Sequence, residues 1–198
     1  MQDLRTESVP EPVATNPEES HTGFARMLLD ILETLVLSVL LFVGINAISA
    51  RIRVDGYSME PTLHTGEFVI VNRLAYQFGS PKIGDVIVFH YPRDPQQEYI
   101  KRIIGLGGDT VRVEGGNVYV DGQRLNEPYI AAPPAYQNTW QVPKDSLFVL
   151  GDNRNNSSDS HNWGFVPMNY VVGKAIAVYW PPEDWGLITH PDLLKATP

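Results

Sequence analysis

The feature that most constrains this chain is an uncharged run of seventeen residues, TLVLSVLLFVGINAISA, between Glu33 and Arg51. As an α-helix the run would be about 25 Å long, slightly short of the ~30 Å hydrocarbon core of a bilayer. Starting the helix at Leu28 lengthens it and lets Asp30 and Glu33 reach towards the headgroups. The run therefore predicts one transmembrane anchor helix, which we place at residues 25–50.

Two other interpretations of this run are weaker. Ala47-Ile48-Ser49 has small residues spaced as at a signal-peptide cleavage site, but the preceding segment is long and acidic where a short basic one is expected. A buried core helix is disfavoured because no other segment has the pattern of helical packing. For orientation, Arg26 precedes the run and Arg51 and Arg53 follow it. A literal positive-inside count thus places the C-terminal part in the cytoplasm, by a margin of one residue.

The N-terminal segment, residues 1–24, is acidic and poor in large apolar side chains, so we expect a disordered cytoplasmic tail. Through Glu33 the chain carries seven acidic residues and two arginines, a net charge of -5, and the remainder carries sixteen acidic and thirteen basic residues, a net charge of -3. The formal net charge of -8 is therefore mostly a property of residues 1–33, the tail and the helix entry. No basic patch indicates binding to nucleic acid.

After Arg53 the chain consists of short β-branched and aromatic runs separated by turn residues, which is typical of strands. The runs are FVIVNRLAY, DVIVFHYP, EYIKRIIGL, SLFVLGD and VVGKAIAVYWPP. TVRVEGGNVYVDGQRL predicts a β-hairpin that turns at Gly115-Gly116-Asn117. The predicted fold class is mostly β: an all-β domain of short strands over 51–182, with a smaller cap-like excursion at 110–146 and a C-terminal extension at 183–198.

The residue inventory excludes several kinds of site. Without cysteine there is no disulfide scaffold, thiolate zinc site, iron–sulfur cluster or cysteine nucleophile. His64, His90 and His161 lack the paired spacing of metal ligands, so we expect no metal and no other cofactor.

Three segments have a composition that is unusual for structural β protein. Ser58, in GYSMEPTLHTGE, is presented on a turn by the restricted backbone around Pro61, although an ordinary turn serine has the same pattern. Lys101, in EYIKRIIGLGGD, shares a strand face with Tyr99 and Ile103, where burial would lower its pKa, unless its head group snorkels to water. GDNRNNSSDSHNWGFVP is a polar loop whose side chains could simply cap the backbone. A Ser–His–Asp triad is the natural rival for Ser58.

Taken together, SMEPTL, YIKRIIGLGGD and GDNRNNSSDS, in this order after one anchor, resemble bacterial type I signal peptidases (leader peptidases). The resemblance spans about residues 30–182, and the single anchor and short excursion are similar to the cyanobacterial and chloroplast branch. It implies a membrane-bound serine endopeptidase with an all-β catalytic domain, which removes signal peptides from exported preproteins after small residues of the Ala-x-Ala type.

The resemblance also implies the roles of individual residues. Ser58 matches the nucleophile and Lys101 the general base of a serine/lysine dyad. Ser157 matches a serine that orients the lysine, and Asp159 a supporting acid of the same loop. The Ser58 N–H would be one oxyanion donor. The candidates to line the substrate pockets are Ile52, Val54, Met59, Leu63, Tyr99 and Ile100.

The chain departs from the family pattern at two positions. Gly56 stands where some members have a serine that donates a second oxyanion hydrogen bond, so a backbone group or water must serve instead. His161 stands where the loop commonly has an arginine, which makes any partnership with Asp159 dependent on the histidine's charge. We expect a less rigid loop that remains active.

The expected partners are preprotein signal peptides, the lipid bilayer and the secretion translocon. The family's orientation has the N-terminus in the cytoplasm and the catalytic domain on the extracytoplasmic side of the plasma membrane or another export membrane such as the thylakoid. This opposes the charge count, and we follow the family because the count's margin is one residue. The rival hypotheses are a related Ser/Lys self-cleaving protease and a non-catalytic membrane-anchored β module that binds a partner.

Overall fold

The structure, a computed structural model, describes residues 18–194 of the 198-residue chain, with side chains from Gly23 onwards. The chain divides into two compact units, residues 1–45 and 46–198. Most of the predicted acidic tail lies outside the described residues.

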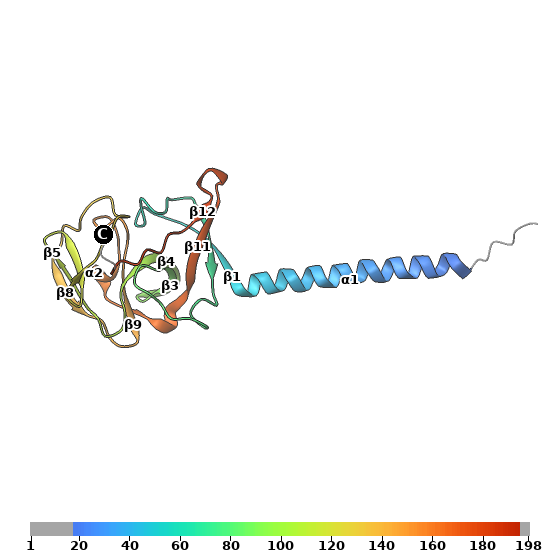
Figure 1. The fold of residues 1–198 in the computed structure, drawn as a ribbon, viewed down its shortest axis with the longest axis horizontal. Helices are drawn as coiled ribbons and strands as arrows, with labels where there is room; N and C mark the ends of the chain where they lie inside the picture. The colour runs from blue at the N-terminus through green and yellow to red at the C-terminus, as the bar shows by residue number, and fades with distance from the viewer. Residues whose placement is uncertain (1–17, 195–198) are drawn as a thin grey trace, which may run out of the picture. The chain divides into compact units, whose positions relative to one another are not determined.

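The described part of the first unit is helical. Helix α1 (Glu18–Ile48) is one uninterrupted helix (Figure 1), and within the described chain its residues Gly23–Ile48 form the one helix long and apolar enough to cross a membrane. Its apolar side chains are exposed, as at Leu41 and Phe42. The helix begins before the predicted residue 25 and ends before residue 50. Glutamate and alanine are good helix formers, so a helix continues beyond the apolar run that marks a membrane span.

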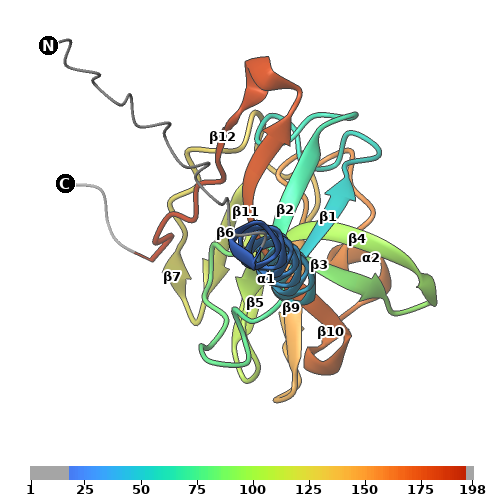
Figure 2. The ribbon, with the colours of Figure 1, turned by 90° about the vertical axis from the view of Figure 1, so that its right-hand side faces the viewer.

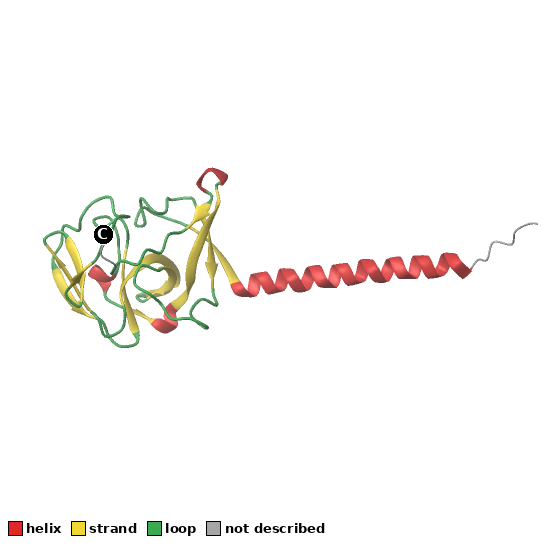
Figure 3. Cartoon of the chain, in the orientation of Figure 1, coloured by secondary structure: helices red, strands yellow, loops and turns green. Residues whose placement is uncertain are grey.

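The second unit consists almost entirely of strands and loops (Figure 3), which confirms the predicted mostly β fold. Its strands are β1 (Ser49–Arg53), β2 (Phe68–Asn72), β3 (Val86–Tyr91), β4 (Asp94–Gly105), β5 (Thr110–Glu114), β6 (Asn117–Val120), β7 (Gln123–Arg124), β8 (Asn138–Gln141), β9 (Ser146–Leu150), β10 (Val166–Pro167), β11 (Val171–Trp180) and β12 (Gly186–Leu187). Its short helices are α2 (Ser160–Trp163), η1 (Met168–Tyr170) and η2 (Pro182–Asp184).

The strands form two antiparallel sheets. The larger sheet has the order β1-β2-β11-β3-β4-β9-β10, with β12 paired to β11, and the smaller has the order β7-β6-β5-β8 (Figure 2). The smaller sheet is built from the segment predicted as an excursion. The predicted hairpin is β5–β6, and its tight turn needs the positive φ angles of Gly115 (56°) and Gly116 (75°).

Buried aliphatic and aromatic side chains fill the space on the faces of these sheets. One cluster packs Val54, Met59 and Leu63 of the loop after β1 against β2, β3 and β11. Another cluster lies on the smaller sheet and includes Leu193, and a third includes Phe89 and Trp163. Ser58, the nucleophile candidate, therefore lies directly before Met59, a residue that the core holds in place.

The predicted C-terminal extension is part of this fold. Strand β12 pairs with β11, and Leu193 is 1% exposed within the core of the smaller sheet. The sequence reasoning missed this because the segment contains isolated apolar residues between prolines rather than a periodic run.

Candidate active site

Ser58 lies on a turn inside a closed loop. The loop is tied at its base because Val54 N–H donates to Glu67 O (2.8 Å) and Gly66 N–H donates to Val54 O (2.9 Å). Within it, Leu63 N–H donates to Met59 O (2.9 Å), and the Met59 and Leu63 side chains are buried. Because the residue after Ser58 is anchored in the core, the hydroxyl of Ser58 is presented from a fixed backbone.

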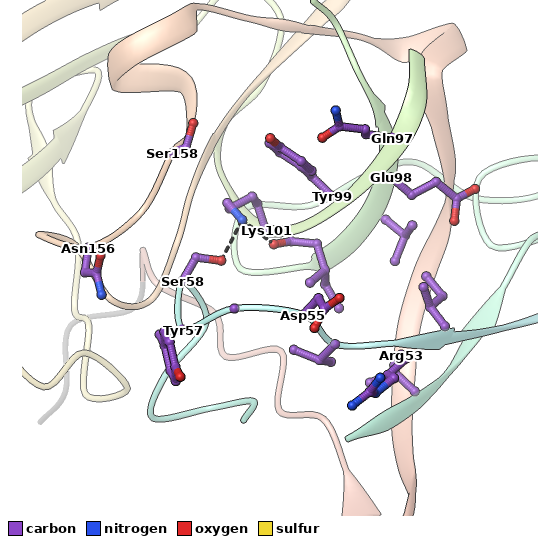
Figure 4. A pocket seen from close by; sticks show the side chains of 16 residues that line it. Arg53, Asp55, Tyr57, Ser58, Gln97, Glu98, Tyr99, Lys101, Asn156 and Ser158 are labelled. Carbon is purple, nitrogen blue, oxygen red and sulfur yellow. Dashed lines mark hydrogen bonds between the residues drawn. The ribbon is translucent and has the colours of Figure 1, made fainter. Parts of the chain in front are cut away.

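Lys101 reaches this hydroxyl from the middle of β4. Its Nζ lies 2.7 Å from Ser58 Oγ and donates to Ile100 O at 2.9 Å (Figure 4). Its Nζ also lies 5.3 Å from the centre of the Tyr99 ring. Lys101 is only 4% exposed, so the head group does not snorkel to water. The alternation predicted for β4 thus brings Lys101 to Ser58, although the two are far apart in sequence.

Burial sets the protonation of Lys101. Desolvation lowers the pKa of Lys101 from 10.5 to about 8, while the carboxylates of Asp159 and Asp152 act in the opposite direction. A substantial fraction of the lysine is therefore neutral near pH 8 and can accept a proton. The serine Oγ at 2.7 Å is the available proton donor.

The polar loop after β9 supports the nucleophile turn. Asn153 donates from its backbone N–H to Ser58 O (3.0 Å) and from its side chain to Tyr57 O (3.1 Å). Gly151 packs so closely that a Cβ there would collide with the carbonyl oxygen of Ser58 and the hydroxyl of Ser157. Only glycine fits at this place, and the loop thereby holds the backbone on both sides of the Ser58 carbonyl.

The two supporting residues have different surroundings. The Oγ atom of Ser157 is buried without a hydrogen-bond partner, so it is close to Gly151 but not bonded to Lys101. Asp159 is fully buried and caps α2, where it accepts from Gly151 N–H (2.9 Å), from His161 N–H (3.2 Å) and from His161 Nδ1 (2.6 Å).

A buried ion pair beside Lys101 was not predicted from the sequence. Arg102 is 0% exposed and binds Asp152 through two hydrogen bonds of 2.8 and 2.7 Å. Thr62 donates to the same carboxylate at 2.5 Å. Asp152 therefore connects β4, the nucleophile loop and the polar loop. Arg102 and Asp152 both lie in motifs that the sequence singled out, but only the fold shows that they pair with each other.

A cavity of about 490 Å³ opens beside Ser58 and Lys101. Four of the six predicted pocket residues line it: Ile52, Val54, Tyr99 and Ile100. Met59 and Leu63 do not line it; they are 1% and 0% exposed within the core beneath the turn, and their part in substrate binding stays a prediction. The lining residues that were not predicted are Arg53, Asp55, Gly56, Tyr57, Val69, Val88, Gln97, Glu98, Asn156 and Ser158.

Two strand edges border the cavity. β1 pairs with β2 on one side, and residues 98–101 of β4 pair with β3 on one side, since β9 pairs only from Arg102 onwards. Both edges therefore present backbone groups that an extended chain can bind, as in strand addition, although Ile100 O already accepts from Lys101 Nζ.

Two groups near Ser58 were considered for catalysis, a second oxyanion donor and a histidine base, and the structure places neither beside it. Gly56 N–H already donates to Thr65 Oγ1 (2.7 Å), so it is not available as a second oxyanion donor. No histidine is among the sixteen described residues that line the cavity, and the partner of Ser58 Oγ is Lys101. The Ser–His–Asp alternative is therefore wrong for Ser58.

Residues 28–180 match the family described as signal peptidase, peptidase S26. The chain is 46% identical over 169 residues to the probable signal peptidase I-2 of Synechocystis sp., covering 81% of this chain and 77% of the relative. It is 42% identical over 193 residues to the signal peptidase I of Leptolyngbya laminosa, covering 92% and 94%. It is 36% identical over 149 residues to the chloroplastic thylakoidal processing peptidase 1 of Arabidopsis thaliana, covering 70% and 44%.

Proposed function

Because this chain belongs to the signal peptidase family, peptidase S26, we propose that it cleaves with Ser58 as the nucleophile and Lys101 as the general base. It is a signal peptidase I, an enzyme that removes signal peptides from preproteins. The observation that carries the residue assignment is the 2.7 Å contact between Lys101 Nζ and Ser58 Oγ in a buried setting.

The chemistry follows from the protonation of Lys101. The neutral amine accepts the proton of Ser58 Oγ while the oxygen attacks the scissile carbonyl carbon, forming a tetrahedral oxyanion. The resulting ammonium then gives that proton to the leaving amine, and the acyl–serine ester remains. Neutral Lys101 next takes a proton from water, which attacks the ester. The ammonium returns this proton to Ser58 Oγ as that oxygen leaves, and the signal peptide is released with a free carboxylate. Ser58 N–H, which donates to no other described residue, is our candidate oxyanion donor.

The substrate would bind as an extended strand between the two open edges of β1 and β4. The apolar walls formed by Ile52, Val54 and Ile100 favour small aliphatic side chains, so the geometry supports cleavage after Ala-x-Ala sequences. Side chains that alternate along the extended chain would enter the cavity at every second position.

The supporting roles remain proposals. Ser157 would orient Lys101 through its hydroxyl. That hydroxyl is buried without a hydrogen-bond partner, so it can still make a hydrogen bond. Asp159 would hold the polar loop and supply negative charge near Lys101, consistent with its effect in raising the pKa of that lysine.

The placement in the cell is likewise part of the proposal. α1 would anchor the protein in the bilayer by a single pass, with the N-terminus cytoplasmic and residues 51–182 on the extracytoplasmic side, where the secretion translocon delivers preproteins. A thylakoid membrane is one candidate, since a thylakoidal processing peptidase is among the relatives; the plasma membrane is the other.

Purified full-length protein in detergent, incubated with a preprotein that carries Ala-x-Ala, tests the assignment. Ser58→Ala and Lys101→Ala should each abolish cleavage at that site. The controls Lys144→Ala, which removes an exposed lysine, and His90→Ala should retain it. Cleavage that persists in Lys101→Ala would end the dyad assignment. Absence of cleavage by the unmodified protein would instead favour the binding-module alternative.

A further inference from the structure

The carboxylate of Asp159 accepts one hydrogen bond from the side chain of His161, whose Nδ1 lies 2.6 Å away. Its other donors belong to the backbone: Gly151 N–H, His161 N–H and, in the capping box of α2, the N–H of Asn162. A fully buried carboxylate needs such donors to remain charged. The direction in which the His161 ring points therefore decides whether Asp159 is fully supported.

The ring of His161 is held by an aromatic neighbour from another part of the fold. It lies parallel to the ring of Tyr136, with centroids 4.0 Å apart and an interplanar angle of 6°. Tyr136 belongs to the segment between β7 and β8 and packs edge-on against Trp140, at 6.5 Å. The Tyr136 hydroxyl makes no hydrogen bond, so the contribution of this residue is its ring. A ring stacked in this way cannot tilt without losing its contact, which keeps it in the plane from which Nδ1 reaches Asp159.

The hydrogen bond does not require a charged histidine. A carboxylate only accepts, so Nδ1 must carry the hydrogen, and it does so in both the Nδ1–H neutral tautomer and the imidazolium. Orientation of the ring by Tyr136 therefore supports the partnership with Asp159 in either form of the histidine.

Asp159 in turn acts on the catalytic pair by two routes. Its negative charge raises the pKa of Lys101, against the effect of burial. Its side chain also fixes Gly151, whose Cα packs against the carbonyl of Ser58. A displaced Asp159 would disturb both the base and the backbone of the nucleophile.

We propose that Tyr136 and His161 are positioning residues of this peptidase, which act through Asp159 on Lys101 and Ser58. The proposal rests on the Ser58–Lys101 assignment made above. Neither residue lines the substrate cavity, so both act without touching substrate. The smaller sheet, through the segment that leads into β8, thereby takes part in catalysis.

The charged and titratable groups around the stacked pair are few. Asp159 faces His161 from the polar loop, and Tyr136 faces it from the opposite side. Arg154 and Glu127 act electrostatically on Tyr136 and are paired with each other at 2.7 Å. The unbalanced charge next to His161 is therefore the negative charge of Asp159.

A double-mutant cycle tests the proposed coupling. Tyr136→Leu removes the stack, and His161→Phe keeps a ring for stacking but removes the donor. Each single variant should lower kcat by about tenfold, with KM within about twofold of the unmodified protein. The kcat of the double variant should be no more than about twofold below that of either single variant, because both changes break the same chain of contacts. Tyr119→Leu, the same substitution elsewhere in the smaller sheet, is the matched control and should stay within about twofold of the unmodified protein.

A second variant tests the electrostatic route and does not depend on removing the ring contact. His161→Arg places a permanent cation beside Asp159, which offsets its negative charge and lowers the pKa of Lys101. The acid limb of the kcat/KM profile should move to lower pH by about half a unit. A residue with a purely structural role would change the height of this profile but not its midpoint.

Two results would overturn the proposal. Losses that multiply in the double variant would mean that Tyr136 and His161 act independently, and an unmoved acid limb in His161→Arg would mean that Asp159 does not transmit charge from this position. Thermal unfolding of every variant separates loss of fold from loss of positioning. Cleavage by the unmodified protein and none by Ser58→Ala must be seen first, so failure of the proposed function is recognised separately.

Discussion

Two neighbouring basic residues of β4 are buried in opposite ways. Arg102 donates to Asp152, to Gly84 O (2.8 Å) and to Thr189 O (3.1 Å), so its permanent charge is fully compensated. Lys101 points to the other face and contacts a hydroxyl and a backbone carbonyl instead. The arginine's charge is thus balanced by its partners, whereas burial without such a partner allows the lysine to lose its proton.

Activity should therefore rise with pH through the titration of Lys101. Because the neutral amine is the base, kcat/KM should increase tenfold per pH unit well below the midpoint and level off above a pH of about 8, the pKa to which burial lowers this lysine. Initial rates of peptide cleavage from pH 6 to 10 measure the profile. An acid limb near pH 6, where an ordinary histidine titrates, would contradict a lysine base.

Lys101 should also lower the stability of the fold at neutral pH. Its folded-state pKa of about 8 lies below the unfolded value of 10.5, so below pH 8 the fold carries a buried charge at a cost of about 3 kcal/mol. Between pH 8 and 10.5 the unfolded chain binds more protons, so stability rises with pH and the penalty disappears. Lys101→Met should raise the free energy of unfolding at pH 7 and raise it much less at pH 10. Urea unfolding checks this, with Lys144→Met as the exposed control; an equal gain at both values of pH would refute it.

At the scale of elements, the segment between β7 and β8 is attached to the polar loop by buried charges. Arg154 is 1% exposed and pairs with Glu127 (2.7 Å), and Tyr129 accepts from Arg154 (3.1 Å) while donating to Glu127 (2.9 Å). The ring of Tyr129 also lies 4.1 Å from the Arg102 guanidinium. The smaller sheet and the polar loop are thus joined as one assembly.

Breaking the Arg154–Glu127 ion pair should lower the stability of the fold. Glu127→Gln leaves the buried guanidinium of Arg154 without its counter-charge and should lower the free energy of unfolding by about 3 kcal/mol. Glu114→Gln removes a carboxylate from an ion pair whose partners are 40% and 59% exposed, and should cost less than about 0.5 kcal/mol. Denaturant unfolding of the two variants compares them directly; similar costs would mean that burial does not decide the value of the pair.

At the scale of the whole molecule, the C-terminal residues close the fold. β12 pairs with the larger sheet, whereas Leu193 packs in the core of the smaller sheet, and Asn126 N–H donates to Leu193 O (2.9 Å). Leu193→Ala should therefore lower the free energy of unfolding by about 2–4 kcal/mol. Leu187, which is 87% exposed on β12, provides the control, since Leu187→Ala removes little buried surface. Thermal or urea unfolding would show no difference between the two if the C-terminal segment were dispensable.

The sequence predicted the strands and site residues that are recognisable from their neighbours along the chain. Periodicity and turn residues predicted β2 to β6, β9 and β11, and the motifs singled out Ser58 and Lys101. The predicted anchor helix included Ser49 and Ala50, which begin β1, because no proline, glycine or charged residue marks the end of the helix at Ile48. The family resemblance named Met59 and Leu63 as pocket candidates, but it does not reveal that both side chains pack in the core beneath the turn.

The two unpaired strand edges beside the cavity also link substrate to the survival of the fold. A peptide that pairs with β1 and β4 binds the folded chain and not the unfolded one, so it shifts the folding equilibrium by mass action. At a hundred times its Kd, such a peptide adds about 2.7 kcal/mol to the free energy of unfolding. A bound substrate would in this way protect the folded enzyme, and a molecule without bound peptide would lack that protection.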